Sequence, residues 1–483
     1  MSSTGNSEQQ AAQAAAAAKR VLLVASGATF MAFLDITVVN IAFPDMHASF
    51  ASTTVSDLSW VVSIYAVLFA ALLTPAGQLA DVIGRRRLFL SGLLVFVGAS
   101  AICAVAPDVT SLIVARAVQG AAAAAMIPAA LGMVLAAAPP ERRAAAVGLW
   151  AASSALASAI GPSLGGLLVD VWGWRAVFVI NVPVGIAIAL AAMRALPSER
   201  PAPRRLPDLV GTLLGSVAIG LLVAGLTKGG DWGWSSGSTV GTLGAGAVLA
   251  TLAVLRARHH PAPAIEMDLW RNRTFAMTNV TSLLFGASVF AFLLLGALFL
   301  TAVWHYSILE TGLAVSPGAL AAAVAAVVVG RRASPRAQRM TVSGGAVVMA
   351  ATCVWMYAAL GDEPRFFELW LPGGLLSGAA IGATFTALAT LAVSSVSPTR
   401  FASATGMNMT ARQLGGALGV AALAAIVGAS VVPATQGLLD VYLFCALAAA
   451  AAAISGLALL ESARSRARAG APGPRAVAAG GEQ

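Results

Sequence analysis

The sequence contains little charge. Of its 483 residues, 10% are Asp, Glu, Lys or Arg, whereas an average soluble domain has roughly 25%. So little charge cannot cover the surface of a soluble protein of this size, which excludes a cytosolic globular enzyme. The 48 glycines and 22 prolines are scattered through apolar runs, so collagen-like and disordered chains are excluded as well. We therefore expect a protein whose solvent is lipid.

Cysteine and lysine are also scarce. Cys103, Cys353 and Cys445 lie in separate apolar runs, and no Cys or His spacing fits a zinc site. Neither Lys19 nor Lys228 belongs to a GxxxxGK[ST] loop, which excludes a pump with its own Walker motif. Aromatic residues are few and are not interleaved with basic clusters, so nucleic acid is not expected as a partner. We expect no catalytic residues, no metal and no cofactor.

What the sequence does contain is a series of apolar spans of about 20 residues, the length that crosses a bilayer. Lipid offers no partner to the open backbone groups of a strand, so these spans are predicted to be helices. The fold class is therefore an all-α integral membrane protein. The fourteen spans are 21–43, 58–77, 88–106, 109–135, 144–169, 175–196, 209–227, 238–257, 275–303, 311–330, 341–360, 366–396, 402–430 and 436–461.

The basic residues alternate from loop to loop. With the N-terminus inside, 24 of the 29 Lys and Arg residues fall in inside loops, three in outside loops and two within spans. The positive-inside rule then predicts an even number of spans with both termini cytoplasmic. The net charge of +9 thus indicates orientation in the cell membrane rather than an anionic partner.

The chain also shows signs of an internal duplication. Gly148 of span five corresponds to Gly406 of span thirteen, and a glycine-rich stretch follows each. Parallel halves of this kind are typical of transporters, whose site lies at their interface. We predict a monomer with a disordered tail at 1–18, a six-helix half at 19–197, a two-helix insert at 208–257, a second six-helix half at 270–462 and a disordered tail at 463–483.

Asp35 is the one acidic residue well inside a predicted span, where a carboxylate is costly and functional by default. From the helical rise, Asp35 lies about 13 Å, and Arg116 about 10 Å, from the same outer side, so the two can meet. Arginine favours the carboxylate whereas desolvation favours the neutral acid, which suits a proton carrier. The alternative is a static buried ion pair that only joins two helices.

The loop at 77–87 reads GQLADVIGRRR. Its glycines allow a sharp turn and close backbone approach. Asp81 can pair with basic residues such as Arg85 and Arg86 and so latch the inside face shut. The alternative is a basic loop that only sets topology.

These patterns resemble the major facilitator superfamily. The loop at 77–87 is similar to its signature between spans two and three. The segment LDITVVNIAFP at 34–44 resembles the first-span motif of its fourteen-span drug:proton antiporters, the EmrB/QacA type. RAVQG at 116–120 resembles the RxxQG motif of span four, and GPSLGG at 161–166 resembles the antiporter motif of span five. Further matching segments are 172–185, 310–312 and 412–416.

The resemblance implies a role for each motif. Asp35 and Arg116 would be the proton-coupling pair. The cytoplasmic gate would comprise Gly77, Asp81, Gly84, Arg85 and Arg86. The antiporter motif, which would make span five pliable, would comprise Gly161, Pro162, Gly165 and Gly166. The second-half counterpart of the gate loop, GRRASPRAQRM at 330–340, lacks an Asp, so a symmetric gate is not expected.

Polar or bulky residues within the spans are candidates to line a substrate cavity, although each could equally face lipid or serve structure. Arg412 lies about 15 Å from the inner end of its span without an evident acidic partner in its half. It could act in the cavity or pack between helices with its charged head snorkelling to the interface. The candidates are Asn40, Tyr65, Gln119, Asn181, Asn279, Phe285, Phe290, Met407, Asn408 and Arg412.

The sequence therefore predicts a proton-coupled antiporter, not an enzyme, that exports amphipathic cationic or neutral drugs and antibiotics. We expect alternating access, with the drug competing for Asp35 with a proton. The expected partners are a small amphipathic organic substrate, protons and membrane lipid. The alternative is the same mechanism dedicated to one metabolite, such as a self-made antibiotic, a siderophore or an amino acid.

Overall fold

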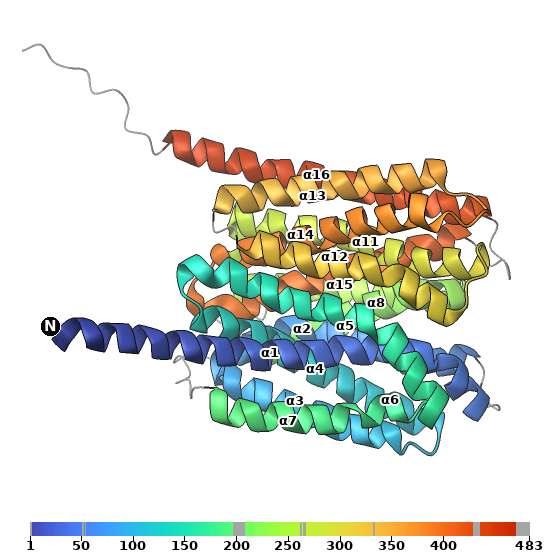
Figure 1. Cartoon of the computed structure of the whole chain (residues 1–483), viewed down its shortest axis with the longest axis horizontal. Coiled ribbons are helices and arrows are strands. Elements are labelled where there is room, and N and C mark those ends of the chain that lie inside the picture. The colour runs from blue at the N-terminus through green and yellow to red at the C-terminus, as the bar shows by residue number, and fades with distance from the viewer. Residues whose placement is uncertain are drawn as a thin grey trace, which may run out of the picture.

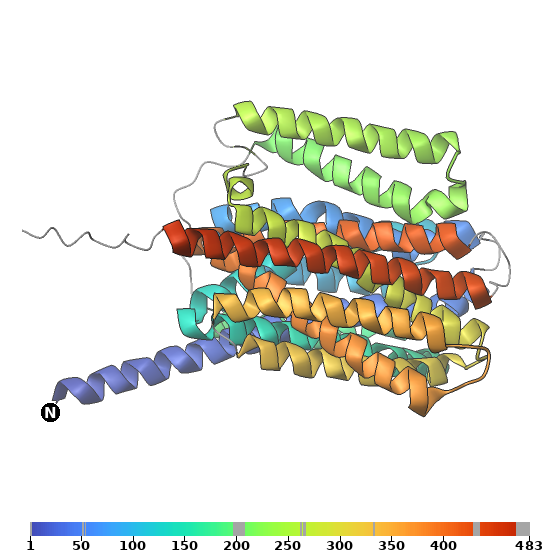
Figure 2. The same cartoon turned by 90° about the horizontal axis from the view of Figure 1, so that it is seen from above.

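A computed structural model describes residues 2–50, 53, 55–196, 208–260, 263, 267–331, 334–427 and 435–469. This part of the chain is a bundle of helices without a strand (Figures 1 and 2). The helices are α1 (Ser2–Ser49), α2 (Val55–Ile83), α3 (Arg85–Ala104), α4 (Val109–Ala137), η1 (Pro140–Arg142), α5 (Arg143–Trp172), α6 (Ala176–Val179), α7 (Asn181–Ala195), α8 (Leu209–Trp232), α9 (Gly237–His259), α10 (Met267–Arg271), α11 (Arg273–Ala302), α12 (Ile308–Gly330), α13 (Pro335–Ala359), η2 (Phe366–Trp370), α14 (Leu371–Ser394), η3 (Pro398–Arg400), α15 (Phe401–Val427) and α16 (Thr435–Ala469).

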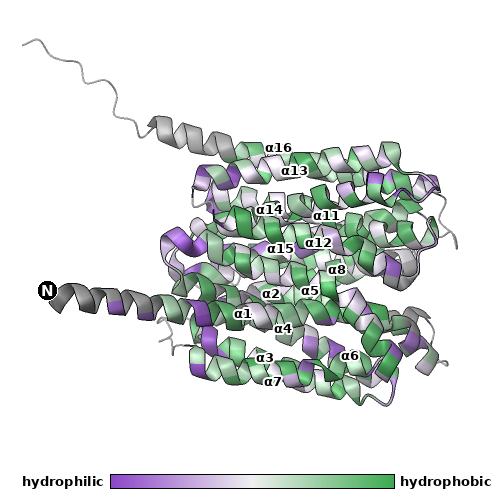
Figure 3. Cartoon of the chain, in the orientation of Figure 1, coloured by the Kyte–Doolittle hydropathy of each residue, from purple (hydrophilic) through white to green (hydrophobic). Residues whose placement is uncertain are grey.

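The predicted number of membrane spans is confirmed. Fourteen helical segments of the described chain are long and apolar enough to cross a membrane, with α6 and α7 together forming one of them. Large apolar side chains lie bare on the outside, such as Leu94, Leu447 and Ile454, which are 57%, 64% and 69% exposed. Figure 3 shows many of the hydrophilic residues at the two ends of the bundle. Such a surface suits lipid rather than water, and the molecule is a multi-pass membrane protein.

The helices pair in a pattern that occurs twice. In the first half, α1 packs on α5, and α4 packs on both α2 and α3. In the second half, α11 packs on α15 in the same way, and α14 packs on both α12 and α13. Between the halves, α5 packs on α12 and α15 packs on α2. Each half therefore carries the same arrangement, and the two share interfaces related by that repeat.

Two glycines allow the halves to approach closely. A Cβ atom added to Gly148 of α5 would lie 2.3 Å from the carbonyl oxygen of Ala326 in α12. A Cβ atom on Gly406 of α15 would lie 2.4 Å from the carbonyl oxygen of Leu73 in α2. Only glycine leaves room for such backbone contact, and the two sites occupy corresponding places in the repeat.

Helices α8 and α9 form an added layer. They pack on each other, and α8 also contacts α2 and α15, one helix from each half (Figure 2). At the end opposite to the loop that joins them, Arg256 Nη2 near the end of α9 donates to Asp208 Oδ1 at the start of α8, at 2.9 Å. This hydrogen bond from the Arg256 side chain lowers the pKa of Asp208 to about 2, so the ion pair persists at neutral pH.

Parts of both terminal segments lie within the described helices. Residues 2–18 continue α1 as a helix that extends beyond the bundle (Figure 1), and residues 463–469 continue α16. Both segments are rich in alanine or arginine, which are strong helix formers and can extend an existing helix at little cost. Residues 470–483 lie outside the described part of the chain.

Candidate functional site

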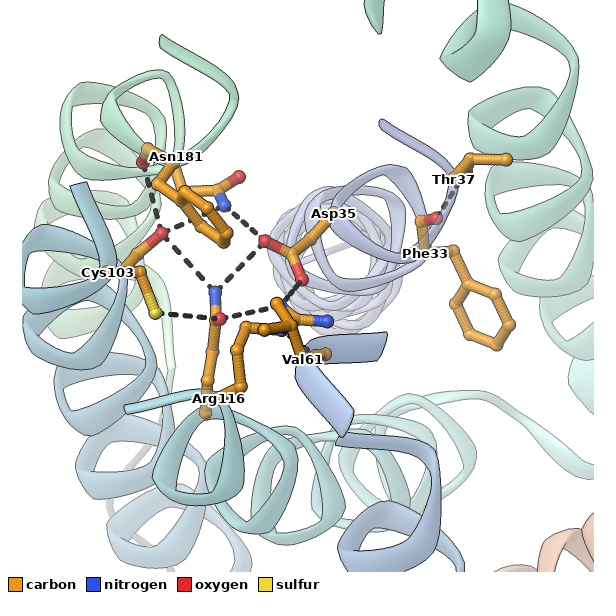
Figure 4. Close-up of polar contacts among 10 residues, drawn as sticks. Phe33, Asp35, Thr37, Val61, Cys103, Arg116 and Asn181 are labelled. Atoms are coloured by element: carbon orange, nitrogen blue, oxygen red, sulfur yellow. Dashed lines mark hydrogen bonds and ion pairs between the residues drawn. The ribbon is translucent and has the colours of Figure 1, made fainter. Parts of the chain in front are cut away.

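A buried carboxylate on α1 lies within the first half. Asp35 is 1% exposed, and three side chains donate hydrogen bonds to its two oxygens (Figure 4). Arg116 Nη1 of α4 donates to Oδ2 at 2.5 Å. Asn181 Nδ2 of α7 and Gln119 Nε2 of α4 donate to Oδ1 at 2.8 and 3.0 Å. Asp35 and Arg116 therefore form a direct ion pair.

The guanidinium of Arg116 is equally enclosed. Its Nε donates to the carbonyl oxygen of Val61 in α2 at 3.0 Å, and its Nη1 also reaches Gln119 Oε1 at 2.7 Å. The ring of Tyr65 lies 4.4 Å from the guanidinium carbon, within the range of a cation–π contact. A buried charge is tolerated only with such pairing, so four groups hold Arg116 in one position.

A serine on α3 extends this network. Asn181 Nδ2 and Gln119 Nε2 donate to Ser100 Oγ at 3.0 and 3.3 Å. Ser100 Oγ donates in turn to the carbonyl oxygen of Phe178 in α6 at 3.0 Å. The polar cluster thus spans α1, α2, α3, α4, α6 and α7, all in the first half.

This arrangement can register a single proton. A carboxylate only accepts hydrogen bonds, whereas a protonated Asp35 would carry one O–H donor and no charge. A protonated Asp35 would accept these hydrogen bonds more weakly, and its attraction to Arg116 would weaken as well. Because the donors come from α4 and α7, protonation of Asp35 would change how α1 packs against both helices.

The opposite face of α1 points away from the cluster. Figure 4 shows Phe33 and Thr37 on the far side of the helix from Asp35, as expected for residues two positions away. In this geometry α1 separates the Asp35 carboxylate from the space that Phe33 faces, and direct competition between drug and proton at Asp35 stays a prediction.

A second polar cluster joins the two halves at the end of the bundle that carries Ser2 and Arg85, here called the basic end. Asp81 Oδ1 accepts from Arg85 Nε and Nη2 at 3.0 and 2.9 Å. Asp81 Oδ2 accepts from the backbone N and the Oγ of Ser403, both at 2.9 Å. Since Asp81 belongs to α2 and Ser403 to α15, this carboxylate binds one half to the other.

Arg85 strengthens the same junction. Its Nη1 donates to the carbonyl oxygen of Gly132 at 3.1 Å, and its Nη2 donates to that of Pro398 in η3 at 2.6 Å. Both Asp81 and Arg85 are 7% exposed. At the basic end a first-half side-chain pair, Asp81 with Arg85, thus binds backbone of the second half, and we call this asymmetric contact the latch.

The other predicted gate residues have separate positions. Gly77 abuts the backbone of Ala402, where a Cβ atom would lie 2.4 Å from its carbonyl oxygen. Gly84 adopts a φ of 102° between α2 and α3, a conformation that favours glycine. Arg86 instead donates to the carbonyl oxygen of Met193 in α7 at 3.1 Å. This bond lies within the first half.

A narrow cavity of about 30 Å³ lies between the halves, room for roughly one water molecule. Helices α1, α4 and α5 of the first half and α14 and α15 of the second half enclose it. Its lining residues are Phe33, Leu131, Trp150, Ala151, Ser154, Phe385, Ala389, Ala392, Thr405, Asn408, Met409 and Arg412.

Comparison with known proteins identifies the fold and the family. The family model described as Major Facilitator Superfamily matches residues 25–420. The chain belongs to the Major Facilitator Superfamily. It is 34% identical over 412 residues to the multidrug resistance protein Stp of Mycobacterium tuberculosis, covering 84% of this chain and 75% of that protein.

Two further comparisons extend this result. The multidrug export protein EmrB of Haemophilus influenzae is 31% identical over 409 residues, which cover 82% of this chain and 78% of EmrB. The predicted resemblance to EmrB-type proteins of the Major Facilitator Superfamily is thus confirmed. The crystal structure of the human organic anion transporter MFSD10 (TETRAN) has the same fold, with a TM-score of 0.65 at 16% identity, covering 89% of this chain and 99% of that one.

The antiporter motif of this superfamily member lies on α5 against α1. A Cβ atom on Gly161 would lie 2.5 Å from Cβ of Thr37, and one on Gly165 would lie 3.2 Å from Val38. Pro162 meets Gly312 of α12, whose added Cβ would lie 2.8 Å away. Gly166 has open space around its Cα, so it is the one motif residue here without a packing reason to be glycine.

The ten predicted cavity residues separate into three groups. Asn408 and Arg412 line the cavity, whereas Tyr65, Gln119 and Asn181 belong to the Asp35 cluster. The remaining five do not line the cavity. Asn40 is exposed, and Asn279 donates to the carbonyl oxygen of Phe275. Phe285 packs against Phe385, Phe290 packs on Gly416, and Met407 lies in the apolar core.

Sequence reasoning missed most of the cavity lining. One signal was available on α15, where Thr405, Asn408, Met409 and Arg412 follow the spacing of a single helix face. The aromatic residues Phe33, Trp150 and Phe385 carried no such signal, because an aromatic residue in a membrane span can face lipid, protein or a cavity with equal ease.

Proposed function

We propose that this protein is a proton-coupled antiporter that exports amphipathic drugs or antibiotics from the cytoplasm through the cell membrane. The names of its relatives Stp and EmrB, a multidrug resistance protein and a multidrug export protein, support this cargo. The observation that carries the coupling is the buried pair of Asp35 and Arg116, since an ionisable group at membrane depth with a fixed partner is what a proton relay requires.

The basic end faces the cytoplasm in this proposal. The distribution of Lys and Arg supports that orientation, with both termini inside. The latch of Asp81 and Arg85 then closes the cavity on the cytoplasmic side. Transport would proceed by rocking of the halves about the cavity, and the latch must open for a substrate to enter.

Coupling would pass through α1. Asp35 lies on one face of this helix and Phe33, which lines the cavity, lies on the other. A proton that neutralises Asp35 weakens its hydrogen bonds to α4 and α7, so α1 can shift and change the cavity wall. Binding of a proton at Asp35 and binding of substrate in the cavity would thus oppose each other through a shift of α1, without both partners contacting the same atom.

The proposed partners are a small organic substrate, protons and membrane lipid. The protein would act as a monomer and need no cofactor, because the proton gradient supplies the energy. Each charge that crosses 100 mV contributes about 2.3 kcal/mol. Its superfamily relatives are transporters, and we propose no enzymatic activity.

Substrate-induced proton release from energised everted vesicles tests this function. A panel of chemically diverse antibiotics should include compounds that discharge the pH gradient when the wild-type protein is present. Asp35→Asn should abolish this discharge while the protein still binds the same compounds. Discharge at the wild-type rate in Asp35→Asn would refute the role of Asp35 as the proton carrier.

A further inference from the structure

The central cavity contains one formal charge, and it is positive. Arg412 of α15 is the only charged side chain among the described residues that line the cavity. The other polar lining groups are neutral, namely Ser154, Thr405 and Asn408. The nearest acid on α1, Asp35, points to the opposite face and is fully used by its own three donors. No acidic side chain of the described lining therefore balances Arg412.

One nitrogen of the Arg412 guanidinium, the buried Nε, lacks a hydrogen-bond partner in the described structure. Its guanidinium carbon lies 4.9 Å from the ring centre of Phe385, a ring that Phe285 fixes by an edge contact at 5.2 Å. A cation–π contact leaves the N–H donors of an arginine unused, and five such donors are available.

This situation differs from that of the buried arginines described above. Arg116 and Arg85 each pair with a carboxylate and donate to backbone carbonyl oxygens. Arg412 is only partly buried and has no carboxylate beside it in the described lining, so an anionic group in the cavity would supply a counter-charge that it otherwise lacks. The cavity lies at the interface of the halves, where a transported molecule must pass.

We propose that this cavity selects organic anions, namely amphipathic compounds that carry an ionised acidic group on an apolar or aromatic framework. The proposal rests on the export function proposed above and narrows its substrate class. Arg412 would bind the acidic group through two parallel N–H donors. Once the halves move apart and widen the cavity, which holds about one water molecule in this structure, Trp150, Phe385 and Phe33 would contact the framework. Asn408 and Thr405 would then bind its neutral polar atoms. Cationic drugs would meet an unbalanced positive charge, in contrast to the expectation from the sequence.

The test uses a set of compounds with one aromatic framework that carries a carboxylate, a carboxamide or an amine. Binding to purified protein in detergent is measured by quenching of tryptophan fluorescence, and transport by proton release from everted vesicles. We expect the carboxylate to bind about 10- to 100-fold more tightly than the carboxamide, the range for a hydrogen bond to a charged group. We expect the amine to bind most weakly.

Variants assign the preference to one side chain. Arg412→Gln should remove the preference for the carboxylate, and Arg412→Lys should retain part of it. Asn408→Asp, which places a carboxylate one helical turn away, should also remove it. Arg336→Gln, which removes an exposed arginine at the basic end of α13, should leave it unchanged. A preference that survives in Arg412→Gln, or a wild-type protein that favours the amine, would overturn the proposal.

The two readouts separate this inference from the general function. If no compound in any charge state releases protons, the antiport function fails, and the binding series still decides the charge preference. If protons are released equally by carboxylate and amine, the antiport function stands and the anion selectivity is wrong.

Discussion

The two halves share a helix arrangement but place charge differently. In the first half the interior contains an ion pair, Asp35 with Arg116, whose side-chain and backbone partners described above all lie within that half. In the second half the interior contains neutral amides, with Asn408 Nδ2 donating to Ser282 Oγ at 2.8 Å. Its one membrane-depth arginine, Arg412, faces the shared cavity. The same packing thus supports a closed charged site in one half and an open one in the other.

This difference suggests a division of roles between the halves. A fully enclosed carboxylate is suited to an event that involves only a proton, since nothing larger reaches it. A cation beside a cavity is suited to a larger partner. Helix α1 connects the two, because Asp35 and Phe33 occupy opposite faces of one rigid element. If the comparison is correct, a change at Asp35 or Arg116 in the first half should alter proton coupling but not substrate selectivity. A change at Arg412 in the second half should alter selectivity but not coupling.

The largest effect is expected from Arg116→Gln. This change leaves Asp35 buried without its counter-charge, and breaking a buried pair in this way costs about 3–5 kcal/mol. The folded protein should lose about that much stability, and proton-coupled export should be lost because Asp35 no longer has its charged partner. Proton release from everted vesicles measures the coupling, and the melting temperature in detergent measures the stability.

Two further variants test the comparison between the halves. The double change Asp35→Asn with Arg116→Gln should recover most of the stability but none of the coupling. Arg412→Gln leaves no carboxylate unpaired, so its melting temperature should stay near the wild-type value. If Arg412→Gln were as unstable as Arg116→Gln, the two arginines would have equivalent structural roles and the comparison would fail.

An intermediate effect is expected from Asp81→Asn at the latch. Asp81 accepts four hydrogen bonds, two of them from Arg85, and bonds to a charged group contribute about 1.5–3 kcal/mol. Losing them should favour the state that is open to the cytoplasm. An impermeant maleimide added to everted vesicles should label Ala151→Cys in the cavity about tenfold faster.

The labelling experiment needs a defined background and control. The three native cysteines are buried and would be replaced by alanine. Glu310→Gln removes a carboxylate whose bonds are to Ser307 at the start of α12, so it should leave the labelling rate unchanged. Equal rates for Asp81→Asn and the protein with an intact latch would show that these bonds do not hold the cytoplasmic side closed.

The fold was predictable because membrane helices impose a simple rule on sequence. Fourteen spans follow from apolar length alone, and the Asp35–Arg116 contact followed from matching depths along two helices. The scarcity of charge made this possible, since few charged residues are tolerated at that depth and each one stands out. The pairing of Asp81 with Arg85 was expected from the segment 77–87. That segment was expected to be a loop, whereas the structure places Asp81 in α2 and Arg85 in α3 with only Gly84 between the helices. The role of the pair as a gate stays a prediction.

Other features depend on which way a side chain faces, and depth does not determine that. Tyr65 and Asn181 have polar groups at membrane depth, yet both point into the first half instead of the cavity. Arg86 is adjacent to Arg85, but the helix turns its side chain toward α7. Ser403 binds Asp81 from the second half, but no motif in the sequence around Ser403 indicates that it contacts a residue so far away in the chain.

The smallest effect is expected at the glycines that join the halves. Gly148→Ala and Gly406→Ala would each push a methyl group into a carbonyl oxygen of the other half, at 2.3 and 2.4 Å, so the two backbones must separate. Export should fall several-fold, and more for Gly148, because the latch of Asp81 supports only the α2–α15 interface.

Gly98→Ala on α3 meets nothing within 4 Å and should stabilise its helix by about 0.5–1 kcal/mol. Initial rates of export measured at equal protein levels would rank the three variants. An effect of Gly98→Ala as large as that of Gly148→Ala would mean that helix flexibility, rather than contact between the halves, limits transport.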